Sequence, residues 1–567
     1  MIYYNINMKK YKVVICTLSA KYIHASLGIW YLHAAIKKNC EPSVDIVILE
    51  SSINDNLDVF SQKIIAEKPD FLGLSCYIWN INLMHELSHI IKQSNSNIQI
   101  CLGGPEVSFN QKQIFNMNKD IDFIIASEGE NPIVKLINSL NNHTSYKDIN
   151  NLSYRENNHV IINPLEKNIN DPINPYSDDF FNNLNGKIAY IETSRGCPYT
   201  CAFCLSGSDN PARFFDLDET FDNIIKLGQS KTQTIKFVDR TFNANIRRTI
   251  KILNFLLYDP RVNRNITYHF EIAGDILNDD LIELFGKAPN GLFQVEIGLQ
   301  SFNETTLSYI TRKTNTTRLK NNIIKLRNNN NMHIHIDLIV GLPFENFESF
   351  KTSFNIAYKL NPHDLQVGFL KVLHGASMRI DTDKYPLIFN DFPPYEIIET
   401  PFISKVEIEQ IKSLEDVLER LYNSQRFINT TTYLMNKSKL EPFDFYYDLG
   451  MYLNQFELYK ISLDDYITLI YNRYKDDLLI KDYLVMDKLI TNNSKQILGI
   501  LKNSYKNSKK IKNYINSNYE LTNNNIIYIL DNMKKVLIVE YHNCDKVTHR
   551  YPHKLLDLLE IEKNIII

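Results

Sequence analysis

The feature of this sequence that most restricts its fold is a repeated alternation of short β-branched runs with longer helical patterns. The strand-like runs of the first part of the chain lie at residues 13–18, 45–49, 71–76, 98–102 and 122–126. Helical patterns separate them at residues 28–38, 57–67 and 84–93. This order predicts an α/β domain over residues 1–145, with a parallel sheet covered by helices on both faces.

In such a sheet the ligand lies beyond the carboxyl ends of the strands. The loops at these ends span residues 21–24, 75–77, 103–106 and 127–130. We expect all four loops to line one crevice.

Residues 146–185 are rich in Asn, Asp and Pro, which predicts a linker, with a short hairpin expected around residues 152–162. A second βα series follows it. The strands of this series are expected at residues 188–193, 234–238, 267–272, 294–298, 333–339 and 365–370. Six βα units are enough for an incomplete barrel over residues 186–395. Residues 396–567 are mostly helical in pattern, with one late apolar strand at 536–541.

Three cysteines fall within eight residues, in the segment Cys197-Pro-Tyr-Thr-Cys201-Ala-Phe-Cys204 directly after the first strand of the second series. Three thiolates in one loop can hold three corners of a cubane iron-sulfur cluster and leave the fourth iron open. A structural zinc site needs four ligands, and no nearby His or fourth Cys completes one. Three buried, inert cysteines are the other alternative, but the soft ligands and their spacing favour the cluster.

The motif resembles the signature of the radical S-adenosylmethionine (SAM) superfamily, Cys-x3-Cys-x-aromatic-Cys, with Phe203 as the aromatic residue. The resemblance implies that Cys197, Cys201 and Cys204 are the catalytic ligands of a [4Fe-4S] cluster. It also implies that SAM binds the open iron and is split by one electron to a 5′-deoxyadenosyl radical. The residues that match SAM contacts of the family are Phe203, Asp239, Glu271, Gln300, Arg312, Asp337, Ile339 and Gly341.

Several of these matches are polar residues at strand ends, which singly are more often capping or solvent-facing groups than ligands. Four of them fall at the carboxyl ends of successive expected strands, the face on which barrel enzymes build their sites. SAM is a zwitterion with a ribose diol, so its site needs acids for the ammonium and hydroxyl groups and an Arg for the carboxylate.

The N-terminal sheet ahead of this barrel resembles the flavodoxin-like, cobalamin-binding (B12) domain of one radical SAM class, and the similarity covers roughly the first 390 residues. The resemblance assigns Ser75, Gly103, Gly104 and Glu128 to cobalamin binding. The Asp-x-His-x2-Gly loop that supplies a cobalt ligand in other B12 proteins is absent, so we expect cobalamin without a protein His ligand. We therefore interpret His24 as an ordinary loop histidine and not as a cobalt ligand. A domain that keeps the fold and has lost the cofactor is the alternative.

The region from residue 396 resembles the DUF4080 extension of one subgroup of these proteins. That similarity implies no activity. A helical domain there could cover the barrel mouth or bind substrate.

Composition restricts the partners and the compartment. With 44% apolar residues, 22% charged residues and a net charge of −3, the chain gives no electrostatic reason to expect a nucleic-acid partner. We find no signal-peptide pattern and no apolar run of about 18 residues, so we expect a cytoplasmic protein without a membrane segment.

The resemblance implies methyl transfer to an unactivated carbon of an unknown small molecule or natural product, with flavodoxin or ferredoxin as reducing partner. A radical rearrangement, cyclisation or oxidation without methyl transfer is one alternative, and a non-catalytic iron-sulfur or electron-transfer protein is another. A tRNA methylthiotransferase-like role has less support. The remaining N-terminal cysteines are spread over expected strands and a helix end, a distribution that is typical of core thiols. They are Cys16, Cys40, Cys76 and Cys101.

Overall fold

The computed structural model describes residues 10–40, 42–167, 170–206, 212–456, 461–502 and 505–565. The chain forms two compact units. The first unit consists of Met1–Ala273, Ile310–Lys313 and Leu370–Ile397. The second consists of Gly274–Tyr309, Thr314–Phe369 and Ile398–Ile567.

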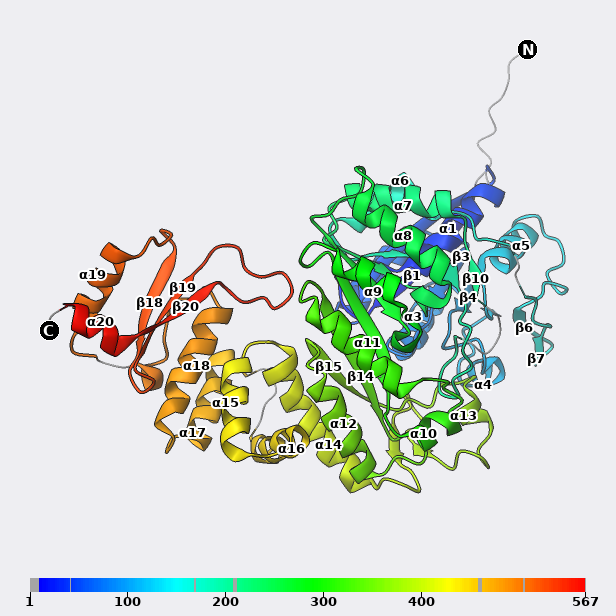
Figure 1. Ribbon diagram of the computed structural model, residues 1–567. Helices are drawn as coiled ribbons and strands as arrows, with labels where there is room; N and C mark the ends of the chain where they lie inside the picture. Colours follow the sequence, from blue (N-terminus) through cyan, green and yellow to red (C-terminus); the bar gives the residue numbers. More distant parts are fainter. Residues whose placement is uncertain are drawn as a thin grey trace, which may run out of the picture. The chain divides into compact units, whose positions relative to one another are not determined.

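The first unit begins with a seven-stranded sheet in the order β2-β1-β3-β4-β5-β6-β7 (Figure 1). Its parallel strands are β1 (Tyr11–Ser19), β2 (Val44–Ser52), β3 (Phe71–Ser75), β4 (Gln99–Gly103) and β5 (Phe123–Ile125). The connecting helices are α1 (Leu27–Cys40), α2 (Leu57–Ala66), α3 (Ile81–Ser94) and α4 (Gln111–Met117), and α5 (Glu130–Asn141) follows β5. The predicted alternation of strands and helices is confirmed.

These strands could be predicted from the sequence because each contains a continuous apolar run. β1 and β4 are buried along most of their length, as expected for parallel strands with helices on both sides. α2, α3 and α4 contribute Phe60, Met84 and Phe115 to one hydrophobic core, and α1 packs against α5.

The hairpin expected near residues 152–162 is present as β6 (Leu152–Glu156) and β7 (His159–Ile162). It extends the sheet, because β6 pairs antiparallel with β5. Asn157 and Asn158 turn the chain with φ of 46° and 66°, the left-handed conformation that tight hairpin turns need. The first part of the expected linker is thus structurally part of the N-terminal sheet.

Six parallel strands make up the central sheet. β8 (Ala189–Ile191), β11 (Thr234–Phe237) and β12 (Thr267–Ile272) pair in the first unit. β13 (Phe293–Gln300), β14 (His333–Val340) and β15 (Asp364–Phe369) pair in the second. Their main helices are α7 (Leu217–Gln229), α8 (Ile246–Tyr258), α9 (Asp279–Gly286), α11 (Thr316–Asn328) and α12 (Phe347–Lys359). All six predicted strands are confirmed as members of this sheet.

Buried and half-buried residues alternate along β14, and this alternation shows which face of the strand carries polar groups. Ile334 and Ile336 are fully buried, and α12 packs against this strand. His335 and Asp337 alternate with them and are only half-buried. Since strand side chains alternate between the two faces, the polar residues lie on the face away from the buried isoleucines.

The C-terminal region is helical, as expected, and also contains a small sheet (Figure 1). Its longer helices are α14 (Lys405–Leu418), α15 (Ile428–Ser438), α16 (Pro442–Leu453), α17 (Leu463–Arg473), α18 (Leu478–Thr491), α19 (Ser508–Asn518) and α20 (Leu558–Ile565). The antiparallel strands are β18 (Asn525–Leu530), β19 (Lys535–Glu540) and β20 (His553–Asp557), in that order. Only β19 was predicted, because it is the buried central strand, whereas β20 is largely exposed.

This region covers the edge of the central sheet. Asn423 accepts a hydrogen bond from the backbone N–H of Leu365 in β15 at 2.9 Å and donates one to the Leu365 carbonyl at 3.1 Å. Asn290, just before β13, donates to Asp545 at 2.8 Å. These contacts involve the edge strand and the amino-terminal end of β13. Phe402 also packs against Phe344 in the loop after β14, with the ring centres 4.5 Å apart.

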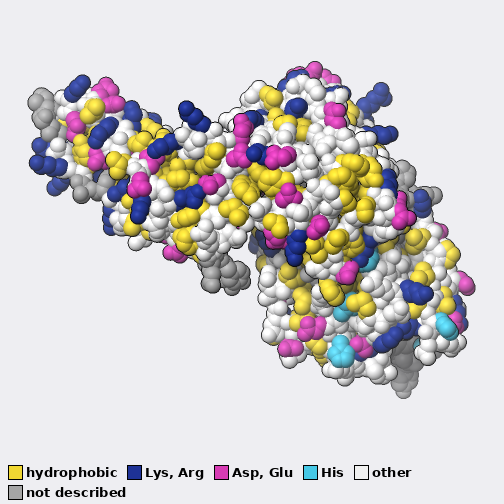
Figure 2. Space-filling model, turned by 90° about the horizontal axis from the view of Figure 1, so that it is seen from below, with side chains coloured by type: hydrophobic (Ala, Val, Ile, Leu, Met, Phe, Trp, Pro, Cys, Tyr) yellow, Lys and Arg dark blue, Asp and Glu magenta, His cyan; other side chains and the backbone are white. Residues whose placement is uncertain are grey.

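The surface mixes both signs of charge. Figure 2 shows Lys and Arg interspersed with Asp and Glu over the face in view. Within the described residues, no helix combines the length and the apolar character that crossing a bilayer requires.

Candidate functional site

The three motif cysteines lie in one loop after β8. All are free thiols; Cys201 is buried, and Cys197 and Cys204 are half-buried. Gly196 has a φ of +90°, a conformation that glycine adopts without strain, so the chain can turn directly before Cys197. Among the described residues, no three His, Cys, Asp or Glu side chains are arranged around a single metal ion. In a cubane cluster each thiolate binds a different iron, so the three sulfurs do not need to converge on one metal ion.

Each of the three sulfurs has a hydrogen-bonding neighbour. Arg312 Nη1 lies 3.6 Å from Cys201 Sγ, Thr241 Oγ1 lies 3.5 Å from Cys197 Sγ, and Ser206 N donates to Cys204 Sγ at 3.4 Å. Burial raises the pKa of Cys201, and the Arg312 guanidinium opposes that rise. Donors next to thiolates stabilise the charged form and tune a cluster bound there. The sequence indicated Arg312 but not Thr241, although Thr241 lies in the same strand-end segment as Asp239.

Asp239 holds the chain that leads into the cysteine loop. It is 2% exposed and accepts hydrogen bonds from Thr193 N at 3.0 Å, Thr193 Oγ1 at 2.7 Å and Ser194 Oγ at 2.5 Å. Burial raises its pKa to about 6. The contact of Asp239 with SAM stays a prediction, since its oxygens serve the chain's own donors in this structure.

Two further pairs of polar side chains lie in the first unit. Glu271 on β12 lies 3.8 Å from Lys236 Nζ on β11. His24 Nδ1 lies 2.6 Å from the Tyr190 hydroxyl on β8. Burial lowers the pKa of His24, so its neutral form is favoured.

Four of the residues matched to SAM contacts lie in the second unit. They are Gln300, Asp337, Ile339 and Gly341. Strand pairing brings the first three together, because Gln300 pairs with Leu338 after a register shift in β13. Gly341 has a φ of +88° directly after β14.

His335, on the same strand, was not anticipated from the sequence. Its Nε2 lies 2.8 Å from Asp337 Oδ1. Burial lowers the pKa of His335, but the contact with Asp337 outweighs burial and raises it to about 9. The signal that could have found it is its spacing of two residues from Asp337, which places both side chains on one face of a strand.

The loops assigned to cobalamin adjoin one another at the carboxyl edge of the N-terminal sheet. Ser75 pairs with Gly103 at the ends of β3 and β4. Gly104 has a φ of +111°, and a Cβ there would lie 2.5 Å from the Cys76 carbonyl oxygen. The large apolar side chains exposed in the loops after β1 and β3 are Tyr22, Ile23 and Trp79, which are 69%, 49% and 45% exposed. A glycine-lined edge beside exposed apolar groups suits a flat apolar macrocycle such as a corrin.

Glu128 makes contacts that the sequence did not suggest. It lies 3.1 Å from Arg195 and 3.1 Å from Arg213. Arg195 also pairs with Glu130 at 2.9 Å and with Glu192 at 2.9 Å. The turn after β5 is therefore tied by ion pairs to the residue two positions before Cys197. Whether Glu128 also contacts cobalamin stays a prediction.

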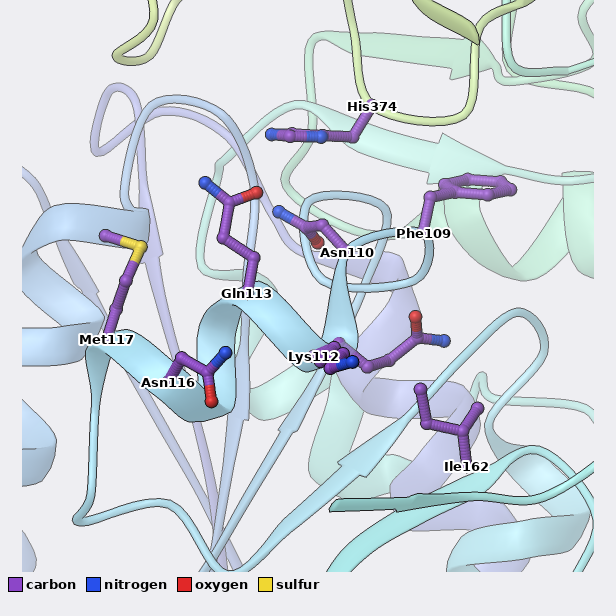
Figure 3. Close-up of a pocket in the computed structure, with 9 residues that line it drawn as sticks. Phe109, Asn110, Lys112, Gln113, Asn116, Met117, Ile162 and His374 are labelled. Carbon is purple, nitrogen blue, oxygen red and sulfur yellow. The ribbon is translucent and has the colours of Figure 1, made fainter. Parts of the chain in front are cut away.

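A hollow of about 640 Å³ lies beside α4, and none of the predicted site residues lines it. In Figure 3, His374 lies across this hollow from α4, near Phe109 and Asn110. Its lining residues are Phe109, Asn110, Gln111, Lys112, Gln113, Asn116, Met117, Ile162 and His374.

Three family models match the chain in succession. The B12 binding domain model matches residues 13–137, the Radical SAM superfamily model residues 191–357, and the model for a protein of unknown function, DUF4080, residues 383–567.

Curated relatives have low identity to the chain. The cobalamin-dependent radical SAM methyltransferase TokK of Streptomyces tokunonensis is 25% identical over 333 residues, which are 55% of this chain and 48% of TokK. An anaerobic magnesium-protoporphyrin IX monomethyl ester cyclase of Rubrivivax gelatinosus is 26% identical over 337 residues, 56% of this chain and 59% of the cyclase. The chain thus spans only about half the length of these relatives.

Among solved structures, the cobalamin-dependent S-adenosylmethionine radical enzyme OxsB matches with a TM-score of 0.62 and 16% identity. The match covers 85% of this chain and 80% of OxsB. At this identity the similarity concerns the fold. In sequence, the chain carries one region that matches the B12 binding domain, one that matches the Radical SAM superfamily and one that matches DUF4080, in that order.

Proposed function

We propose that this chain is a cobalamin-dependent radical SAM methyltransferase that acts on an unactivated carbon of a small-molecule substrate. The observation that carries the proposal is the cysteine loop. It presents three free thiols, sets Arg312 against Cys201, and is joined through Arg195 to the turn after β5 of the B12 binding domain.

When bound, a [4Fe-4S] cluster would supply the electron that cleaves SAM to a 5′-deoxyadenosyl radical, and cobalamin would supply the transferable methyl group. Cys197, Cys201 and Cys204 would hold the cluster and leave one iron open. Arg312, whose Nη1 donates to Cys201 Sγ, would bind the SAM carboxylate. Asp239 orients the loop by holding Thr193 and Ser194.

The other matched side chains would each contribute to SAM binding. Glu271 and Asp337 are acids at strand ends that can accept hydrogen bonds from ammonium or ribose hydroxyl groups, and Gln300 can do so through its amide oxygen. Ile339 would pack against the adenine, beside the glycine turn at Gly341. Ser75, Gly103 and Gly104 would approach the cobalamin tail.

The methyltransferase assignment is supported by the name of TokK among the relatives. A small-molecule substrate and a reducing partner such as flavodoxin or ferredoxin belong to the same proposal.

A second candidate function is a ring-forming radical reaction without methyl transfer. It is favoured by the similarity to the anaerobic cyclase, which is of the same extent as the similarity to TokK.

Product analysis separates the candidates. The reconstituted protein is reduced without air, mixed with SAM, and its products are quantified by mass spectrometry. A methyltransferase gives S-adenosylhomocysteine as well as 5′-deoxyadenosine, because SAM is both methyl donor and radical source. The cyclisation candidate gives 5′-deoxyadenosine alone, and unchanged SAM would contradict both.

A further inference from the structure

After β15 the chain returns to the first unit and forms a segment that we name the strap, residues 370–380. The strap includes the short helix α13 (Ser377–Ile380). It is anchored to residues 395–397 by two backbone hydrogen bonds, Val372 N to Tyr395 O at 2.9 Å and Ile397 N to Leu370 O at 2.8 Å.

One end of the strap holds the cysteine loop. The carbonyl of Ala202, between Cys201 and Cys204, accepts a hydrogen bond from Met378 N at 3.1 Å and one from Ser377 Oγ at 3.1 Å. Ala202 is 2% exposed and Met378 is 1% exposed, so water does not compete for these bonds. The strap therefore fixes the backbone between two cluster ligands.

The middle of the strap contacts the loop that follows Gly103 and Gly104. Gly375, with a φ of +88°, packs so closely on Phe109 that a Cβ at this position would lie 2.4 Å from the ring. Next to this contact, the Tyr395 hydroxyl donates a hydrogen bond to the carboxylate of Glu106. Both Tyr395 and Glu106 are buried.

Arg379 makes this assembly rigid. Its guanidinium donates to the Val372 carbonyl at 2.7 Å and lies 4.6 Å from the centre of the Tyr395 ring. The His374 ring meets Tyr395 edge-on at 5.0 Å. These contacts hold the two ends of the strap and residues 395–397 in one arrangement.

We propose that the strap is a positioning element that fixes the cysteine loop against the Gly103–Gly104 loop and so sets the separation between the iron-sulfur cluster and cobalamin. The inference rests on the proposed function. In the proposed reaction the 5′-deoxyadenosyl radical would take a hydrogen atom from the substrate carbon and end as 5′-deoxyadenosine, and the substrate radical would then take the methyl group that cobalamin supplies. The substrate must therefore lie within reach of both groups, and displacements of about 1 Å can cost roughly a hundredfold in rate. Tyr395, Gly375 and Ser377 are positioning residues, since they act through the two loops.

Two variants loosen the strap in different ways. Tyr395→Phe removes the hydroxyl that bonds Glu106 and keeps the ring under Arg379. Gly375→Ala adds a methyl group against Phe109 and pushes the strap away from the loop. Tyr433→Phe is the matched control, because it removes a Tyr hydroxyl that donates to Asp477 at 2.8 Å in the second unit.

Hydrogen exchange of the full chain, without any ligand, measures how strongly the strap is coupled to the cysteine loop. In Tyr395→Phe, we expect the amide of Met378 and the segment 200–206 to exchange about tenfold faster than in the wild type, as expected for the loss of about one hydrogen bond. The Tyr433→Phe control should leave both unchanged. Wild-type exchange of these amides in both strap variants would overturn the proposal.

Electron paramagnetic resonance of the reconstituted protein measures the separation between the iron-sulfur cluster and cobalamin. With iron, sulfide and corrin contents equal to the wild type, the magnetic coupling between Co(II) and the reduced cluster should change in both strap variants and not in the control. A purely structural role would lower the melting temperature and leave the coupling of the folded protein unchanged, which would overturn the proposal. A wild-type protein that takes up the cluster but no corrin would instead defeat the proposed function, and the strap would have no cobalamin to position.

Discussion

At the scale of single residues, the cysteine loop combines ligands with the groups that prepare them. Arg312 and Thr241 lie next to sulfurs, and Asp239 fixes the backbone that precedes them. Substitutions here should therefore separate loss of the cluster from loss of SAM binding.

Cys201→Ser should lower iron content after anaerobic reconstitution and reduce SAM cleavage by more than about 100-fold. Loss of a partner behind a metal ligand already costs about 10–100-fold, and a direct ligand is worth more. The matched control is Cys544→Ser, which changes an exposed thiol of the C-terminal region. Wild-type iron and activity in Cys201→Ser would contradict the cluster assignment.

Arg312→Ala should weaken SAM binding about 10–100-fold while iron content falls less, because a charged hydrogen bond to the SAM carboxylate is lost. Isothermal calorimetry on the reconstituted protein measures the effect. Arg261→Ala, which removes an exposed Arg that pairs with Asp259, is the control. Equal SAM affinity in Arg312→Ala and the wild type would reject this role of Arg312.

Glu345 gives the second unit a defined pH dependence. It is 1% exposed and accepts hydrogen bonds from Ser301 Oγ at 2.5 Å and Ser353 Oγ at 3.1 Å. Burial raises its pKa to about 7, above the ordinary value of 4.5. Between these values the folded chain holds a proton that the unfolded chain releases, so the free energy of unfolding falls as pH rises from about 4.5 to 7.

Glu345→Gln keeps an acceptor for both serines and cannot ionise. We expect it to raise the free energy of unfolding at pH 8 by on the order of 1–3 kcal/mol and to have little effect at pH 4.5. Denaturant unfolding at both pH values measures the difference, with exposed Glu283→Gln as control. An unfolding free energy that changes with pH as in the wild type would show that Glu345 ionises normally.

At the scale of elements, the edge strand β15 depends on the C-terminal region. Asn423 pairs with both backbone groups of Leu365 and so occupies hydrogen-bonding positions of the sheet edge.

Asn423→Ala should lower the free energy of unfolding by about 1–3 kcal/mol, because a backbone donor and acceptor lose their partner. It should also increase self-association through the uncovered edge. Thermal unfolding and light scattering test this, with the exposed Asn454→Ala as control. Unchanged stability and scattering would mean that water serves Leu365 equally well.

Elements could be predicted from the sequence wherever burial is continuous along a strand or alternates regularly. The run around Val14 is fully buried, and in β14 every second residue, including Ile334 and Ile336, is buried, so both apolar patterns are visible in sequence. The pairing of β6 with β5, the strand β20 and the strap could not be read in this way, because each depends on a partner distant in the chain or on a largely exposed strand.

The same reason separates the site residues that could be predicted from those that could not. Cys197 and Arg312 stand in recognisable local motifs. Arg195 stands beside the motif, but its partners Glu128 and Glu130 lie more than sixty positions earlier, and only the fold brings them together.

At the scale of the whole molecule, the first unit collects its functional parts from distant stretches of the chain. Ile310–Lys313 supplies Arg312, and Leu370–Ile397 supplies the strap. Together with the cysteine loop and the loops after β3, β4 and β5, they place every group assigned to the cluster and to cobalamin in one compact unit. We therefore expect one protein to hold both cofactors.

The most direct test is to purify the full chain without air, reconstitute it with iron, sulfide and a cobalamin, and quantify all three with zinc in one sample. We predict about four iron and four sulfide per chain together with about one corrin. A colourless protein, or one that takes up zinc and no iron-sulfur cluster, would contradict it.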